Sequence, residues 1–156
     1  MLNKKGDGYI PICILIVILC MMLAIFITFV SAVNIVRQTK RNARVVLDNY
    51  VMQNSIEIYD EIKNGNDHIE VIDTSSYINA FSSFNSLDLS DDMLYCYDDE
   101  GNELYRIMIP VTSFVQEKQL KIKLEFDIII PMYFAGIRVV EATVPVNVTS
   151  LFNEKY

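Results

Sequence analysis

One uninterrupted apolar run dominates the first part of the chain. Residues 8–36 carry no charge, and 15 of the 24 residues from 10 to 33 are Ile, Leu, Val or Phe. As a helix, this run of 29 residues would be about 43 Å long, against roughly 30 Å for the hydrocarbon core of a bilayer. Its large apolar side chains favour insertion by about 5 to 9 kcal/mol. The pattern predicts a transmembrane helix at residues 9–36, preceded by a short leader at residues 1–8.

The helical pattern continues beyond the apolar run. No Gly or Pro occurs between residues 12 and 64, and apolar residues recur at spacings of three, four, seven or eight. These positions are Val36, Ala43, Leu47, Tyr50, Ile58 and Ile62. Gly65 then provides a typical C-terminal stop. We expect one helix of about 50 residues, in which residues 37–64 form an amphipathic continuation that packs against the domain that follows.

Residues 65–156 show mainly the alternation of a half-buried sheet. Residues 120–128 alternate strictly, with apolar side chains at even positions, and residues 137–148 resume that phase after an interruption at 128–131. Residues 93–97 and 104–110 flank an acidic turn, which is typical of a hairpin. A capping run at 73–76 predicts a short helix to residue 84, and residues 82–92 have the composition of a loop. Together these elements predict an α+β domain with about four antiparallel strands packed on the long helix.

Charge divides the chain into a basic and an acidic part. Residues 1–44 hold six basic groups against Asp7, whereas residues 45–156 have a net charge of −12. An acidic domain would repel phosphates, so nucleic acid is not an expected partner. Four of the basic residues form one helical stripe directly after the apolar run, namely Arg37, Lys40, Arg41 and Arg44. The stripe fits contact with lipid headgroups, or pairing with acidic neighbours in an assembly of parallel helices.

The sequence contains no recognisable catalytic or cofactor-binding motif. It has no Gly-x-Ser-x-Gly elbow and no glycine-rich phosphate loop. Acidic residues gather near the predicted hairpin, but their spacing differs from that of a calcium loop. His68 is the single histidine, so no second histidine is present to share a metal ion. We predict a protein without enzymatic activity, metal or cofactor.

Two features of the apolar segment leave alternatives open. Val30-Ser31-Ala32 fits a signal-peptidase site, and a cut after Ala32 would release a soluble secreted domain. The count of basic residues alone favours a cytoplasmic C-terminal domain, whereas Lys4 and Lys5 before the span are typical of anchors that export it. A retained single-pass anchor is the interpretation that the length of the run favours.

The N-terminal sequence resembles that of a known family. Lys4-Lys5-Gly6-Asp7-Gly8-Tyr9-Ile10, followed by an apolar helix and a basic amphipathic stalk, resembles the TadE/TadF-like minor pilins (pseudopilins) of tight-adherence pili, which are type IV pilin-like. Residues 126–134, a turn at 135–136 and the strand at 137–148 are similar to the family's C-terminal end. Related small families occur in Gram-positive bacteria.

The resemblance implies both processing and partners. A prepilin peptidase would cut between Gly6 and Asp7, and the partners would be membrane lipid, other pilin-like subunits and the pilus assembly platform. The protein would sit in a bacterial cell membrane as a single-pass subunit with its C-terminal domain outside. Many pilins carry a glutamate five residues after the cut, and this chain has Pro11 there. The alternative is a single-pass binding or sensor module unrelated to pili.

Overall fold

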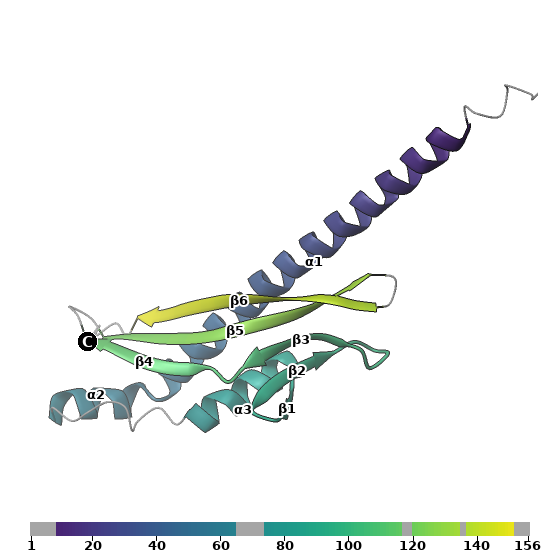
Figure 1. The fold of residues 1–156 in the computed structure, drawn as a ribbon. Helices are drawn as coiled ribbons and strands as arrows, with labels where there is room; N and C mark the ends of the chain where they lie inside the picture. Colours follow the sequence, from purple (N-terminus) through teal and green to yellow (C-terminus); the bar gives the residue numbers. More distant parts are fainter. Residues whose placement is uncertain (1–8, 65–73, 117–119, 135–136, 152–156) are drawn as a thin grey trace, which may run out of the picture. The chain divides into compact units, whose positions relative to one another are not determined.

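The computed structural model describes residues 9–64, 74–116, 120–134 and 137–151 (Figure 1). It contains helices α1 (Tyr9–Gln53), α2 (Ser55–Asn64) and α3 (Thr74–Asn85). The strands are β1 (Asp88–Ser90), β2 (Met93–Tyr97), β3 (Glu103–Met108), β4 (Val111–Gln116), β5 (Leu120–Phe134) and β6 (Ile137–Leu151). The chain forms two compact units, Met1–Ile35 and Val36–Tyr156.

In the first unit, α1 exposes its apolar side chains on all sides. Ile10, Leu15 and Phe26 are each more than 60% exposed, and the most apolar window of the helix has a mean hydropathy of 3.3. The Thr28 hydroxyl donates to the Ala24 carbonyl at 2.9 Å, so this polar side chain is hydrogen-bonded within the helix. A single helix of this length and composition fits a single-pass membrane anchor.

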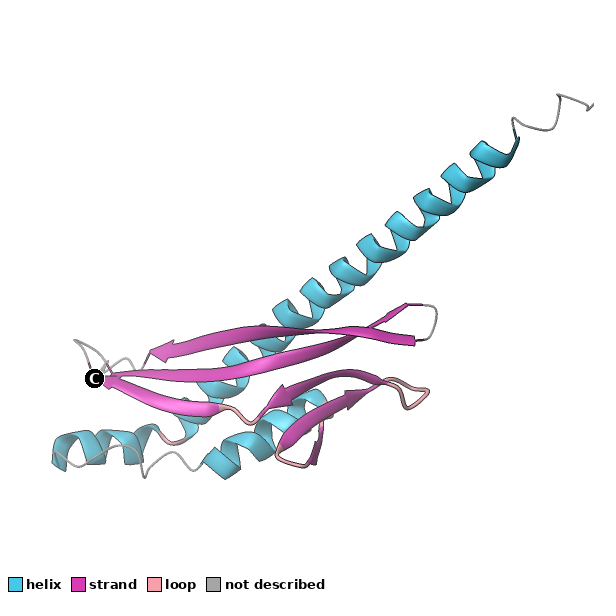
Figure 2. Ribbon diagram, viewed as in Figure 1, coloured by secondary structure: helices cyan, strands magenta, loops and turns pink. Residues whose placement is uncertain are grey.

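The second unit is a two-layer α+β domain, with the strands forming one antiparallel sheet (Figure 2). The order along the sheet is β1-β2-β3-β5, and β6 pairs with the other edge of β5. β4 continues along the same edge of β5 that β3 occupies. Pro110, which is buried and has no N–H to donate, separates β3 from β4.

Alternation along β5 and β6 defines an inner and an outer face of the sheet. On β5 the even positions from Ile122 to Ile130 are buried, and on β6 Val146 and Val148 are buried opposite Phe126 and Leu124. These side chains form the inner face. The odd positions of both strands form the outer face, where the charged groups described below lie.

The helices of the second unit cover the inner face of the sheet. Tyr77 and Phe81 of α3 are fully buried, and Phe81 meets Phe126 of β5 with ring centroids 6.0 Å apart. The Tyr77 ring also meets Tyr50 of α1 edge to face, and its hydroxyl donates to the Ala43 carbonyl at 3.3 Å. The part of α1 from Val36 onward is therefore one wall of the core, as the amphipathic pattern predicts.

The structure corrects the predicted helix boundary. Instead of one helix to Asn64, α1 ends at Gln53 and α2 begins at Ser55. Asn54 lies between them, and its side-chain amide donates to the Tyr50 carbonyl at 2.9 Å, which also accepts the Asn54 backbone N–H at 3.1 Å. The Tyr50 carbonyl thus accepts from both the backbone and the side chain of Asn54, a local side-chain bond of the kind that disfavours Asn within helices.

The structure also corrects the number of strands from four to six. β1 lies within the segment expected to be a loop, and β4 follows Pro110, where the predicted strand ended. β5 continues through residues 128–131, where the alternation is lost, as far as Phe134. The predicted short helix, the hairpin and the last strand are confirmed as α3, β2–β3 and β6.

Candidate functional site

Four charged side chains form a cluster on the outer face of the sheet, and we call it the ion-pair cluster. Its members are Glu103 and Arg106 of β3, and Arg138 and Glu141 of β6. Arg106 donates to Glu103 at 2.8 Å and to both oxygens of Glu141 at 2.9 and 3.0 Å. Arg138 pairs with Glu141 and lies 3.7 Å from Glu103.

Two irregularities of the sheet bring these groups to one face. Residues three apart on a regular strand point to opposite faces, yet Glu103 pairs with Arg106 and Arg138 pairs with Glu141. The register explains this, because Tyr97 pairs with Glu103 after Cys96 pairs with Tyr105, so that Leu104 is skipped. β6 skips one residue in the same way, between the partners of Met132 and Tyr133. Bulges re-aim side chains and often occur beside functional sites.

The cluster explains the apolar run that interrupts the alternation of β5. Ile129 and Pro131 lie on the outer face, where β5 is otherwise polar, and Pro131 is buried. β3 pairs with β5 at Ile128 and Ile129. The pairing lies just before Pro131, which has no backbone N–H to donate to the sheet. Because Arg106 reaches from β3 to Glu141 on β6, the cluster spans β5 at this point. The opposite charges of the cluster neutralise one another, so we interpret the cluster as a structural link between the strands.

A second charged feature is a hollow lined by residues of α1, β5 and β6, which we call the basic hollow. It has a volume of about 500 Å³. Its lining residues are Lys40, Arg44, Lys121, Lys123, Asn147, Val148, Thr149 and Leu151. The hollow therefore joins two residues of the predicted basic stripe with two lysines of β5, about 80 residues away along the chain.

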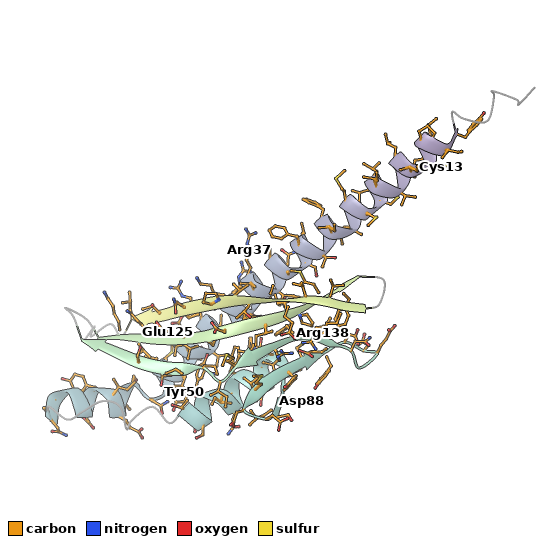
Figure 3. All side chains as sticks on the ribbon, viewed as in Figure 1. Cys13, Arg37, Tyr50, Asp88, Glu125 and Arg138 are labelled. Carbon is orange, nitrogen blue, oxygen red and sulfur yellow. The ribbon has the colours of Figure 1, made fainter. Side chains whose placement is uncertain are left out.

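The predicted basic stripe is present on α1, and the structure divides it. All four of its residues are exposed, and Figure 3 shows Arg37 projecting away from the helix. Lys40 and Arg44 line the basic hollow, whereas Arg37 and Arg41 do not. The guanidinium of Arg44 is also 3.8 Å from Asp48, and both side chains are at least half exposed. Gly6 and Asp7, the predicted processing site, lie outside the described residues.

The acidic hairpin between β2 and β3 is held by its own side chains. Asp98 accepts the backbone N–H groups of Glu100 at 3.0 Å and Asn102 at 2.7 Å, and Gly101 adopts the positive φ that the turn requires. The amide of Asn102 also donates to Asp98, and these hydrogen bonds lower the pKa of the Asp98 carboxyl. The Asp98 carboxylate thus closes the turn, and the described residues contain no group of acidic, His and Cys side chains that could hold a metal ion.

One half-buried polar group links α1 to the sheet. Tyr105 faces inward, and burial, followed by the neighbouring Cys96 thiol, raises its pKa to about 12. A hydrogen bond to Thr39 of α1, which is only 2% exposed, acts in the opposite direction. Cys96 is a free thiol, as are Cys13 and Cys20. Sequence patterns could not indicate this contact, since it joins residues more than 50 positions apart.

Comparison with known proteins yields no match. No protein-family model, no curated protein and no solved structure matches this chain. The fold and the charged features described above are therefore the basis for a functional proposal.

Proposed function

We propose that this protein is a membrane-anchored pilin-like subunit, of the minor pilin or pseudopilin type, that takes part in assembling a type IV or Tad-like filament. In this role the acidic domain lies outside the cytoplasm, and the protein acts through assembly contacts and performs no catalysis. The proposal combines the N-terminal motif with the fold of the chain.

One observation carries the proposal most directly. A single helix, α1, provides an apolar segment of membrane-spanning length and then, from Val36, one wall of the core of an α+β domain. In a pilin-like subunit, the apolar segment holds the protein in the bilayer before assembly. Packing of such helices side by side then replaces their contacts with lipid.

The helix also argues against release as a soluble domain. Residues around Ala32 and Val33, where a signal peptidase would cut, are part of the continuous helix α1. The segment before that bond exceeds the 7 to 15 apolar residues that are typical of a cleavable signal. Retention of the helix is common to the pilin-like proposal and to its alternative, a membrane-anchored binding or sensor module.

Co-purification distinguishes these two functions. The tagged full-length chain should be isolated in mild detergent from cells that assemble the filament, and the co-purifying proteins identified by mass spectrometry. A pilin-like subunit should bring down other pilin-like subunits or the membrane platform. A matched variant with polar replacements in the span, Ile16→Asn and Leu19→Asn, should lose these partners while the charged domain is unchanged. Recovery of a solitary monomer from cells with intact pili would contradict the proposal.

A further inference from the structure

We propose that one end of the β5–β6 pair rests on the surface of the lipid bilayer that α1 spans. The contact is made where β5 finishes and β6 begins, by three exposed apolar side chains that we call the apolar end. They are Tyr133 of β5 and Val139 and Val140 of β6. This contact requires the membrane anchor alone and not assembly into a filament, so it goes beyond the proposed function.

The apolar end gathers exposed apolar surface in one place. Tyr133 is 43% exposed, Val139 is 63% exposed and Val140 is 55% exposed. Val139 is the residue that β6 skips in the register, so this bulge leaves it without a partner on β5. Clustered apolar side chains on a surface mark sites of contact with a protein or a membrane.

The inner face of β6 loses its cover gradually toward the apolar end. Val148 and Val146 are each 3% exposed, Val144 and Ala142 are half-buried, and Val140 is 55% exposed. These even positions share one face of the strand. The apolar row that forms the core therefore continues beyond the helices that cover it, and a bilayer would provide the missing cover.

Two contacts within the second unit show in which direction β5 runs along α1. Asp48 accepts the hydroxyl of Ser150, which pairs with residue 122 near the start of β5. Thr39, nine residues earlier on α1, is hydrogen-bonded to Tyr105 of β3. The register of β3 and β5, extended by one residue, places Tyr105 beside Ile130. β5 therefore runs back along α1, toward the start of the second unit.

The same contacts give the level that the apolar end reaches. Nine residues of α1 rise by about 14 Å, and eight residues of β5 cover this length, so each advances by about 1.7 Å along the helix. Three further residues carry the strand from Ile130 to Tyr133, about 5 Å beyond Thr39, and Val36 also lies about 5 Å beyond Thr39. Residue 36 is the last of the uncharged run, so the bilayer surface is expected at this level.

The side chains of the apolar end suit the interface between lipid and water. Tyrosine is enriched at this depth, because its ring is apolar and its hydroxyl can remain in water. The valines add apolar surface without polar atoms. Arg138, which Figure 3 labels, pairs with Glu141, so the charge beside the valines is neutralised within the protein.

Carboxylates near this end of the sheet determine the kind of contact. Glu103, at the start of β3, is 3.7 Å from Arg138, so the acidic turn that precedes it lies at the same end of the sheet. Asp98 in this turn is fully exposed and remains ionised, because its hydrogen bonds lower its pKa. Anionic headgroups would repel the turn. We therefore expect the contact to be apolar and to form on zwitterionic lipid.

A tryptophan introduced at the apolar end tests the contact, because the natural chain contains none. The full chain with Val139→Trp should be placed in phosphatidylcholine vesicles whose acyl chains carry bromine near the headgroup. Bromine quenches tryptophan within the interface, so the emission should fall by about twofold or more relative to unbrominated lipid. The matched control is Leu151→Trp, which is 53% exposed in the parent and lies at the opposite end of β6. Its emission should not change.

Tyr133→Trp provides a second reporter that keeps an aromatic side chain, and it decides the outcome if circular dichroism shows that Val139→Trp disturbs the fold. Quenching at the apolar end but not at Leu151→Trp supports the contact. Equal emission in brominated and unbrominated lipid would overturn it, since the apolar end would then face water or a protein partner. Quenching that requires phosphatidylglycerol and disappears in high salt would also overturn it, because the basic stripe would then hold the domain at the membrane.

Discussion

Arg106 on β3 donates hydrogen bonds to both carboxylate oxygens of Glu141 on β6, across the strand that lies between them. The contact is joined by Glu103 and Arg138, which two skipped residues in the register bring to the same face. It crosses β5 where Pro131 removes a donor from the ladder. The ion-pair cluster therefore holds together three strands at a point where backbone hydrogen bonding is weakened.

Arg106 should be the most important member of this cluster for stability. Its side chain is 17% exposed and contacts both glutamates, so Arg106→Met leaves two carboxylates close together with only Arg138 to neutralise them. We expect a loss of about 1 to 3 kcal/mol in the free energy of unfolding. The measurement is chemical denaturation of the full chain in detergent, followed by the circular dichroism of the sheet.

Arg138 provides the matched control for that substitution. Its side chain is 40% exposed, and solvent screens its contacts more strongly. Arg138→Met should therefore cost less than about 1 kcal/mol. Equal effects of the two substitutions would show that the cluster does not act as a link centred on Arg106.

The end of β6 should depend on one hydrogen bond to α1. Ser150 is 4% exposed, and its hydroxyl donates to the carboxylate of Asp48 at 2.5 Å. Ser150→Ala should reduce the free energy of unfolding by about 1 to 2 kcal/mol, because a bond to a charged acceptor is lost from a buried position. Thr143→Ala, on the exposed face of the same strand, should change it by less than about 0.5 kcal/mol. A Ser150→Ala variant as stable as the parent would mean that water replaces the hydroxyl without cost.

Alkaline pH should destabilise the domain through Tyr105. Its pKa is raised to about 12 in the folded state, chiefly by burial, against about 10 in the unfolded chain. The stability that this difference confers is present below pH 10 and is lost as the pH rises from about 10 to 12. Tyr105→Phe should show a smaller decline over this range, although burial also raises the pKa of Tyr77, so part of the decline should persist.

Tyr59→Phe is the control for the alkaline experiment, because Tyr59 on α2 is 47% exposed. This variant should follow the parent between pH 10 and 12 when unfolding is measured at each pH. If Tyr105→Phe declined as steeply as Tyr59→Phe, the buried hydroxyl of Tyr105 would not be the source of the effect.

Local patterns predicted the elements that have a regular period. The strict alternation at 120–128 marks the inner face of β5, and the capping run before Tyr77 marks the start of α3. The amphipathic positions Ala43 and Leu47 are fully buried, as a helix packed on a sheet requires. These features depend only on residues that are close in sequence, within two turns of a helix or a few positions of a strand.

Features that depend on distant residues were missed. The apolar residues Ile129 and Pro131 interrupt the alternation because the ion-pair cluster covers the outer face there, and the cluster needs partners from two other strands. β4 was missed because a proline such as Pro110 usually ends a strand. In the structure Pro110 separates β3 from β4, and both strands pair with the same edge of β5. The basic stripe is visible in the sequence. That two of its residues line the same hollow as Lys121 and Lys123 is visible only in the structure.

The most direct test of the account as a whole is the intact mass of the chain purified from the membrane fraction of the cells that make it. A pilin-like subunit retained by its helix and processed after Gly6 should begin at Asp7. Gly6→Leu should block the cut, whereas Gly8→Leu, a matched substitution two residues further on, should leave it in place. A mature chain that begins at Met1, or a soluble chain that begins at Val33, would contradict the account.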